Sequence, residues 1–307
     1  MRGIGRILGI DVGATNLKVG IFNIRGRHML HLLTERTDHA RLLAQLDRII
    51  WNAPHFDSIG MALPGLLDKS ARVWQRSPNI RSVKDLKLAQ ILERRHGTKV
   101  ALSNDAVAAV MGEREFGVGG RSENLVYITL STGIGAGAIV DGRVLTGKGG
   151  GAHEAGHSTV DMNAALRCSC GSYGHWEAYC SGNGIPNFAR LLLRTKLRGM
   201  VPPAGGRRLT AKAIFDASQT NTAARAIVEE IGRVNAIGFA NVTNMYDPEL
   251  IAVGGGIALA NPGLVLGPIR SHIGKYCFND APRIVQSKLG EHASLYGAVV
   301  PLVGRRV

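Results

Sequence analysis

The sequence predicts an α/β protein made of two related lobes that face each other across a cleft. Its 307 residues suffice for two domains of ordinary size. A strand, a turn of small residues and a second strand occur at residues 7–22, and the same pattern recurs ~120 residues later, at 125–140. Helix and strand patterns follow each of these pairs, so we expect each pair to begin one lobe.

The amino-acid composition is that of a globular protein. Hydrophobic residues make up 45%, charged residues 20%, and 40 glycines supply turns, which excludes a disordered chain. No apolar run approaches the ~18 residues that a membrane helix needs, and the N-terminus has no signal-peptide pattern. Four cysteines fit a reducing compartment. We therefore expect a cytoplasmic protein without a membrane partner.

The net charge of +14 raises the question of a nucleic-acid partner. Lys and Arg are spread along the whole chain, without a long basic run or interleaved aromatic residues, so most are expected on solvated faces. A positive field also attracts a small polyanion such as ATP by electrostatic steering. Charge alone does not separate these interpretations.

The first pair of strands carries a possible phosphate site. An apolar, β-branched run at 7–12 ends near Asp11, and an alternating run follows at 17–22. Small residues in the turn let backbone N–H groups wrap a phosphate, and Asp11 could hold Mg²⁺ through water. The turn feeds a strand and not a helix, unlike the common phosphate motifs. An ordinary hairpin explains the pattern equally well. The turn consists of Gly13, Ala14, Thr15 and Asn16.

Strands and helices alternate through the rest of the first lobe. Apolar residues at helical spacing after Asp38 predict a helix that this residue caps, and Pro64-Gly65 ends a strand sharply. A loop is expected at Ser77-Pro78-Asn79. The predicted elements are strands at 28–34, 56–63 and 98–102 and helices at 38–51, 85–95 and 105 to about 116.

Asp105 lies at the junction between the strand at 98–102 and the next helix. One interpretation is that Ser103, Asn104 or Asp105 simply caps the helix. The other is that Asp105 points into a cleft as a general base, with Asn104 beside it to bind a polyol. Spacing alone leaves both open.

The second lobe is expected to begin after a linker-like stretch at 117–124. Its turn, Ser131 to Gly135, repeats the small-residue pattern of the first lobe, and Gly254, Gly255 and Gly256 follow a strand in a turn that could carry a nucleotide. A terminal helix is expected to return to the first lobe. The predicted elements are strands at 125–130, 136–140, 250–253 and 283–287 and helices at 184–197, 210–218, 222–246, 262–273 and 293–303.

A cluster of metal-ligand residues lies between these elements, in residues 149–182. His157, Cys168, Cys170 and His175 form an H-x10-C-x-C-x4-H set, the ligand complement of a closed tetrahedral zinc site. A Cys168–Cys170 disulfide is the alternative, but it would be strained, and no secretory signal precedes it. Cys180 and Cys277 lie outside the set and are expected to be buried apolar residues. Two carboxylates, Glu154 and Glu177, bracket the set.

Over essentially its whole length the chain resembles the ROK family (repressor, open reading frame, kinase) of the actin/hexokinase-like ATPase fold. Asp11, Gly13 and Thr15 resemble the first phosphate motif of that family, and residues 131–135 the second. Residues 254–256 resemble its adenosine motif. The segment from Glu154 to Glu177 is similar to the family signature and is the most specific match.

The resemblance implies an α/β chain of two RNase H-like domains around a cleft, with an inserted zinc loop. The smaller N-terminal lobe would span 1–118 and be joined by the C-terminal helix 291–307, and the larger lobe would span 119–290. A homodimer is expected.

The resemblance also implies ATP-dependent phosphorylation of a hexose, glucose being the expected substrate, with Asp105 as general base. ATP would bind with Mg²⁺, and Zn²⁺ would be structural. The residues expected at the nucleotide are Asp11, Gly13, Ala14, Thr15, Asn16, Lys18, Thr132, Gly133, Gly254, Gly255 and Gly256. The residues expected at the sugar are Pro64, Gly65, Asn79, Asn104, Asp105, Glu154, His157 and Glu177.

Two positions depart from the family pattern. His175 stands where the family more often has cysteine, and imidazole remains an acceptable zinc ligand. His153 stands where a small residue is expected, and the sequence does not explain it.

Three other functions compete with this interpretation. A sugar-sensing repressor of the family needs a helix-turn-helix ahead of the first phosphate motif, which here begins about six residues from Met1, so we expect no nucleic-acid partner. A kinase of N-acetylhexosamines would differ only in the room around the sugar C2, where Leu66, Leu67 and Asn79 could decide. An actin-like filament protein has no use for the cluster at 154–177.

Overall fold

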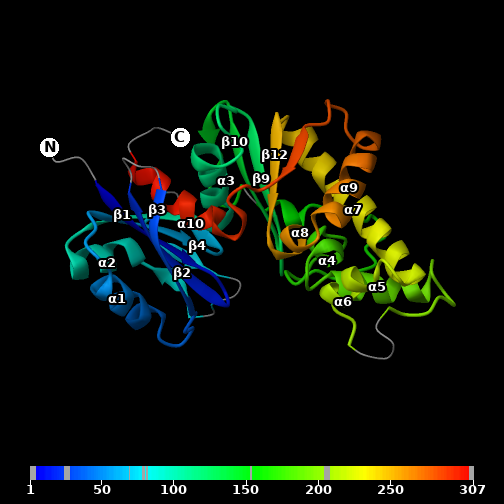
Figure 1. Cartoon of the computed structure of the whole chain (residues 1–307), viewed down its shortest axis with the longest axis horizontal. Helices are drawn as coiled ribbons and strands as arrows, with labels where there is room; N and C mark the ends of the chain where they lie inside the picture. The colour runs from blue at the N-terminus through cyan, green and yellow to red at the C-terminus, as the bar shows by residue number, and fades with distance from the viewer. Residues whose placement is uncertain are drawn as a thin grey trace. The chain divides into compact units, whose positions relative to one another are not determined.

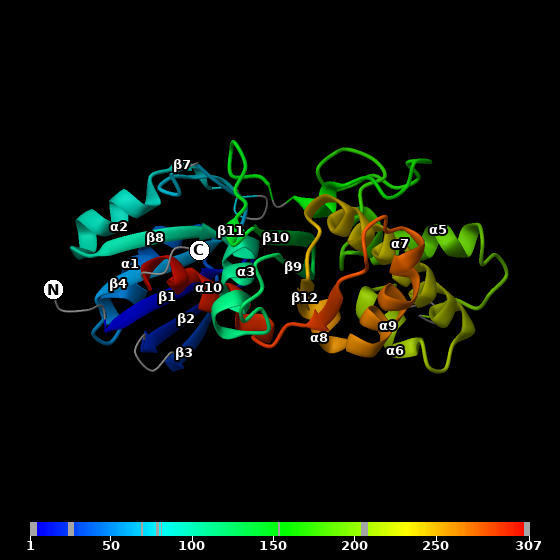
Figure 2. The ribbon, with the colours of Figure 1, turned by 90° about the horizontal axis from the view of Figure 1, so that it is seen from above.

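The computed structural model describes residues 5–23, 28–68, 70–77, 80, 82–152, 154–203 and 208–303 (Figures 1 and 2). Its internal contacts divide the chain into two compact units. Unit 1 comprises Met1–Ser122, Gly137–His153 and His292–Val307, and unit 2 comprises Glu123–Ala136 and Glu154–Glu291. Residues 137–153 thus group with unit 1, whereas the predicted division assigned all of 119–290 to the second lobe.

Unit 1 contains a five-stranded sheet. Its strands are β1 (Arg6–Val12), β2 (Asn16–Asn23), β3 (His28–Arg36), β4 (Ser58–Leu63) and β8 (Lys99–Asn104). Their order is β3-β2-β1-β4-β8, in which β1, β4 and β8 run parallel and β2 and β3 continue the sheet in antiparallel pairing. Because the carboxyl ends of parallel strands meet at one edge, the residues that end β1, β4 and β8 lie together.

Helices cover both faces of this sheet (Figure 1). They are α1 (Leu42–Asn52), α2 (Leu88–His96), α3 (Asp105–Phe116) and α10 (Ala293–Val299), which a 3-10 turn, η4 (Val300–Leu302), follows. Side chains alternate along β1, so that Leu8 and Ile10 join the core under α1 and α2 while Ile7 packs against α10. By the same alternation Asp11 lies on the face that α3 and α10 cover.

Two helices begin later than the sequence pattern predicts. α1 begins at Leu42 and not at Asp38, because the Asp38 carboxylate accepts hydrogen bonds from the backbone N–H groups of Ala40 (3.1 Å) and Arg41 (3.0 Å) and forms a turn ahead of the helix. α2 begins at Leu88 and not at 85, because the preceding residues pair as a strand.

That strand belongs to a small three-stranded sheet that the sequence analysis missed. Its strands are β5 (Leu66–Leu67), β6 (Trp74–Arg76) and β7 (Lys84–Leu86). Strands of two or three residues are too short to show an alternating pattern. The sheet is anchored by Trp74, which is fully buried and donates from Nε1 to the carbonyl oxygen of Pro64 (2.9 Å). The loop predicted at 77–79 includes Pro78 and Asn79, which lie outside the described residues.

A second five-stranded sheet has the order β11-β10-β9-β12-β13. Its strands are β9 (Leu125–Leu130), β10 (Ile134–Val140), β11 (Arg143–Val144), β12 (Leu250–Gly254) and β13 (Arg283–Gln286). β12 runs parallel to both β9 and β13. The boundary between the two units falls within β10. The turns that follow β9 and β12 therefore leave the same edge of the sheet, in unit 2.

The helices of unit 2 follow the predicted ranges closely. They are α4 (Glu177–Cys180), α5 (Ile185–Arg194), α6 (Ala211–Ala217), α7 (Thr222–Tyr246), α8 (Gly256–Ala260) and α9 (Pro262–His272), with the 3-10 turn η1 (Ala155–His157). α7 packs along α9, and Trp176 is buried against α7, where its Nε1 donates to Asn235 (2.8 Å). The short helices α4 and α8 were not predicted.

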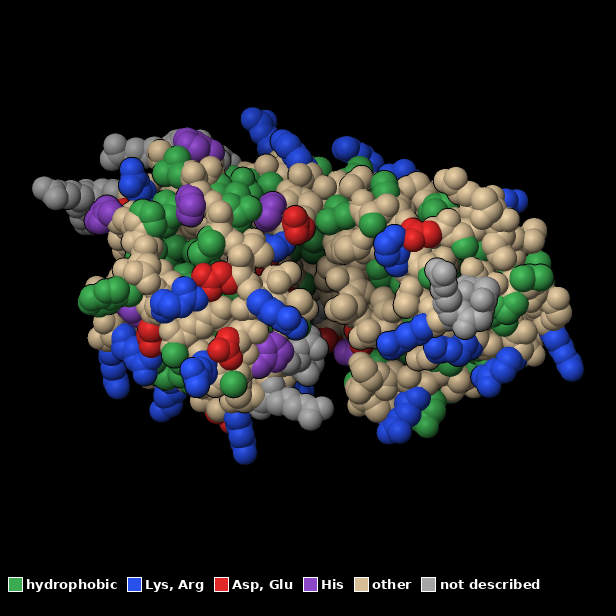
Figure 3. Space-filling model, turned by 60° about the horizontal axis from the view of Figure 1, so that its bottom comes forward, with side chains coloured by type: hydrophobic (Ala, Val, Ile, Leu, Met, Phe, Trp, Pro, Cys, Tyr) green, Lys and Arg blue, Asp and Glu red, His purple; other side chains and the backbone are tan. Residues whose placement is uncertain are grey.

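None of the helices in the described ranges combines the length and apolar character that a bilayer span requires. Lys and Arg side chains are spread over the visible face of each unit in Figure 3 and do not gather in one cluster on that face.

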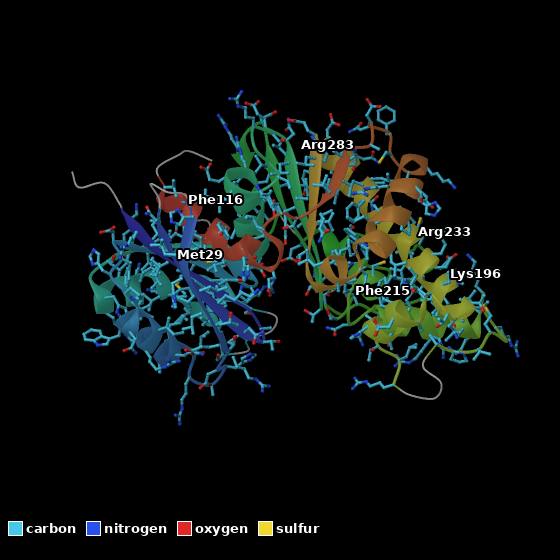
Figure 4. All side chains as sticks on the ribbon, viewed as in Figure 1. Met29, Phe116, Lys196, Phe215, Arg233 and Arg283 are labelled. Atoms are coloured by element: carbon cyan, nitrogen blue, oxygen red, sulfur yellow. The ribbon has the colours of Figure 1, made fainter. Side chains whose placement is uncertain are left out.

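Close packing of α3 against α10 holds the terminal helix on unit 1. A methyl group added at Gly297 would lie 1.5 Å from the carbonyl oxygen of Ala108, and one at Gly112 would lie 2.5 Å from that of Ala293. The two helix backbones therefore touch at glycine. Phe116, which is labelled in Figure 4, extends the contact through its ring pair with Tyr296.

Replacing Gly297 by alanine should lower the free energy of unfolding by at least about 1–3 kcal/mol, because the helices must separate to admit the methyl group. Urea denaturation measures the change. Gly263→Ala is the matched control, since a methyl group there meets nothing within 4 Å, and it should change stability by less than about 1 kcal/mol. Equal effects of the two substitutions would contradict the close contact.

Candidate active site

The carboxyl edge of the unit 1 sheet gathers most of the site residues predicted in the first lobe. Asp11 is the penultimate residue of β1, Pro64 and Gly65 follow β4, and Asn104 and Asp105 stand at the junction of β8 and α3. Asp11 pairs with Lys18 across the β1–β2 ladder. Asn79, which was predicted to join this group, lies outside the described residues.

Asn104, and not Asp105, caps α3. Its Oδ1 accepts hydrogen bonds from the backbone N–H groups of Ala106 (2.8 Å) and Val107 (3.1 Å), and its Nδ2 donates to the carbonyl oxygen of Gly65 (3.0 Å). Of the three possible caps the structure selects Asn104, and the role of Asp105 as a general base stays a prediction. Asp105 begins the helix beside a cap that is already made, so its carboxylate is not needed for capping.

Asp11 and Asp105 lie close enough to interact electrostatically. The pKa of Asp11 is raised from 3.8 to about 7. Burial is the main cause, the negative charge of Asp105 adds to the increase, and the positive charge of Lys18 opposes it. Two neighbouring carboxylates in a partly buried place resist ionising together. A divalent cation at Asp11 would relieve this repulsion, so the pair suits a magnesium site.

The first glycine turn is held from outside by two residues that the sequence analysis missed. Thr37 donates from Oγ1 to the carbonyl oxygen of Gly13 (2.8 Å), and His39 Nε2 lies 2.6 Å from the carbonyl oxygen of Ala14. The side chains of Thr15 and Asn16 are exposed at the tip. These contacts fix the backbone and leave the tip open to a ligand. No local pattern around 37–39 marks that role.

In unit 2, the four predicted metal ligands come together. Their ligand atoms all lie within 4.8 Å of one another. Cys168 Sγ is 3.6 Å from His157 Nδ1, and Cys170 Sγ is 3.3 Å from His175 Nδ1. In a tetrahedral site with Zn–S of about 2.3 Å and Zn–N of about 2.0 Å, a sulfur and a nitrogen stand roughly 3.5 Å apart. The set therefore fits a closed zinc site in geometry as well as in chemistry.

The histidines of this set are suited to bind a metal and a second group at once. Burial lowers the pKa of His175, nearby His157 lowers it further and Glu177 opposes the shift, and the net lowering favours the neutral imidazole that a metal ligand requires. His157 turns Nδ1 to Cys168, while its Nε2 lies 3.6 Å from the carboxylate of Glu154. The Glu154 carboxylate thus lies next to the set. His153 lies outside the described residues.

Glycine is required for different reasons in the second turn, at 131–133, and in the third turn, at 254–256. A methyl group at Gly133 would lie 2.6 Å from Oε2 of Glu177. At Gly254 it would meet the Tyr127 hydroxyl at 2.1 Å, and Gly255 has a φ of +87°. Gly256 has open space around its Cα, which allows a ligand to approach closely.

A cavity of about 490 Å³ lies at the far end of α8 from the third turn. Its volume is within the range typical of small-molecule sites. Phe215, which α6 contributes, is labelled in Figure 4. No sequence pattern indicates this cavity, because its lining comes from segments far apart in the chain. The lining residues are Phe215, Asp216, Gln219, Ala260, Asn261, Pro262, Gly263 and Leu264.

Comparison with known proteins assigns the chain to a family. The model of the ROK family matches residues 7–303. The chain belongs to the ROK family. It is 33% identical to a glucokinase of Aeropyrum pernix, over 96% of each chain. It is 27% identical to the xylose repressor of Bacillus subtilis, over 95% of this chain and 76% of the repressor.

A solved ROK structure has the same fold. The ROK family glucokinase of Streptomyces griseus, in complex with glucose and AMPPNP, superimposes with a TM-score of 0.80 at 28% identity, over 96% of this chain and 98% of that one. The family and the two-lobed α/β ATPase fold predicted from the motifs are therefore confirmed.

We expect the purified protein to carry about one zinc ion per chain, and Cys170→Ser to lose it, because the substitution removes one of four ligands. Elemental analysis measures the metal content. Cys277→Ser is the matched control, since Cys277 is not in the set, and it should keep the metal. Retention of zinc by Cys170→Ser would exclude this site.

The carboxyl pair predicts a dependence of stability on pH. Because the pKa of Asp11 is about 7 in the folded chain and 3.8 ordinarily, the folded state keeps a proton that the unfolded state releases. The free energy of unfolding should therefore fall as pH rises from about 4 to 7. Asp11→Asn should remove this loss of stability. Without divalent cations, its free energy of unfolding minus that of the wild type should therefore increase by about 2–3 kcal/mol between pH 5 and 8.

Denaturant unfolding at both pH values measures the difference. The control is Asp85→Asn, at an exposed carboxylate, which should follow the wild type. A constant difference between Asp11→Asn and the wild type would show that Asp11 titrates normally.

Proposed function

We propose that this protein transfers the γ-phosphoryl group of ATP to a hydroxyl group of a hexose, with glucose as the preferred sugar. The observation that carries the proposal is the placement of Asp105 near Asp11, at the edge where the first glycine turn leaves β1. One carboxylate is available to accept a proton and the other to stand near a metal-bound phosphate. The glucokinase relatives, similar over nearly the whole chain, support the same activity.

In the proposed reaction Asp105 is the general base. It accepts the proton of the sugar 6-hydroxyl group while the oxygen forms a bond to the γ-phosphorus, and the bond from that phosphorus to the ADP oxygen breaks. Asn104 caps α3 and so holds Asp105 in place. Mg²⁺ bound near Asp11 would neutralise charge on the phosphate oxygens.

The glycine turns and the cavity are proposed to bind the nucleotide. Backbone N–H groups of 13–16 and 131–133 suit the phosphates, because small residues allow close approach. The open space at Gly256 and the cavity beyond α8 suit the nucleoside. Gln219 and Asn261 offer amides that can bond a base edge, and the buried Phe215 forms part of the cavity wall.

Glu154, His157 and Glu177 are proposed to bind sugar hydroxyl groups. The metal set would hold these residues and take no part in activating water, since a closed four-ligand shell leaves zinc no open position. His157 can serve both purposes, because Nδ1 faces the set and Nε2 faces Glu154.

An ADP-release assay across glucose, mannose, fructose, N-acetylglucosamine and N-acetylmannosamine tests the function. Glucose should give the highest kcat/KM. A preference for an acetylated sugar would instead make the protein a hexosamine kinase, and binding of sugar without ADP release would favour a sensor over an enzyme.

Asp105→Asn should lower kcat by ~10²–10⁴-fold, the usual cost of losing a general base. Its melting temperature should stay within about 2 °C of the wild type, because Asn104 still caps α3 and the new amide oxygen can still accept from Ala106. Asp85→Asn, an exposed site, is the matched control and should keep full activity. A kcat near the wild-type value would remove Asp105 from this role.

A further inference from the structure

The Glu177 carboxylate touches two segments to which the proposed function gives different tasks. Its Oε1 accepts a hydrogen bond from Ser169 Oγ (2.9 Å), the residue between Cys168 and Cys170. Its Oε2 accepts one from the backbone N–H of Ile134 (2.9 Å), immediately after the turn at 131–133. One side chain therefore joins the metal loop to a glycine turn.

The approach of Glu177 requires the glycine at 133. A methyl group there would lie 2.6 Å from Oε2, so any other residue would push the carboxylate away from Ile134. The carboxylate oxygen that accepts the backbone N–H of Ile134 therefore fixes the end of this turn directly.

The remaining contacts of the turn lead to the same stretch of chain. Gly182 donates its N–H to the carbonyl oxygen of Ser131 (2.7 Å), and Asn183 donates to that of Thr132 (3.3 Å). On the other side, a methyl group at Gly156 would lie 2.2 Å from the carbonyl oxygen of Ile134. Residues 156 to 183, which carry the metal set, thus support the turn along its length.

We infer that Ser169 and Glu177 are positioning residues that couple the metal loop to the turn at 131–134, so that the order of the loop sets affinity for the nucleotide as well as for the sugar. The inference rests on the proposed function for its assignment of this turn to phosphate binding. Each carboxylate oxygen has a second lone pair, so Glu177 can keep both contacts and still accept from a sugar hydroxyl group.

Ser169→Ala tests the coupling without touching a metal ligand. It should leave the zinc content unchanged, speed hydrogen exchange at the Ile134 amide, and weaken AMPPNP binding by about 3–10-fold, the effect of losing one hydrogen bond. Ser169→Thr should restore both properties, because it keeps the hydroxyl group. Cys170→Ser should shift both in the same direction as Ser169→Ala, and further.

Ser172→Ala is the matched control, since Ser172 is an exposed serine of the same loop that gives only its backbone oxygen to Cys168. Unchanged exchange at Ile134 and unchanged AMPPNP affinity in Ser169→Ala would overturn the coupling. If the wild type binds no AMPPNP, the proposed function fails. The exchange rate at Ile134 still decides whether Ser169 and Glu177 hold the turn.

Discussion

The chemistry of unit 1 depends on the parallel pairing of β1, β4 and β8. This pairing brings the ends of three strands, which are far apart in the sequence, to one edge, and it sets Asp11 near Asp105 there. The cost is visible in the raised pKa of Asp11, because burial and a like charge oppose its ionisation. Keeping two carboxylates in such a place costs stability, and carboxyl groups with perturbed pKa values are typical of functional sites.

In unit 2 the candidate site residues at 154–177 belong to no long helix or strand. Loops of this kind hold side chains poorly unless something fixes them. Four ligand atoms within 4.8 Å would provide that anchor once a metal is bound, and Glu177 adds hydrogen bonds from Ser169 and from the backbone N–H of Ile134. A metal held by these four ligands would therefore also fix where the acidic side chains lie.

Glycine has distinct uses across these elements. At Gly297 and Gly112 it lets two helix backbones touch, and at Gly133 it admits a carboxylate, whereas Gly256 leaves space that no protein atom fills. In the sequence these glycines look alike. Only the neighbours that the fold supplies separate packing from ligand access.

The sequence alone determined the family, the order of the main strands and helices and the metal set. These follow from local signals, namely apolar periodicity, small-residue turns after strands and a ligand spacing that rarely occurs by chance. It also singled out Asp105, but left open whether Ser103, Asn104 or Asp105 merely caps the helix or Asp105 acts as a general base. The tertiary structure decided which residue caps α3, because Asn104 is also bonded to Gly65, which follows another strand. The small sheet around Trp74, the support of the first turn by Thr37 and His39, the cavity at Phe215 and the link through Glu177 were equally beyond the sequence. Each joins residues that are distant in the chain, and no local pattern encodes such a contact.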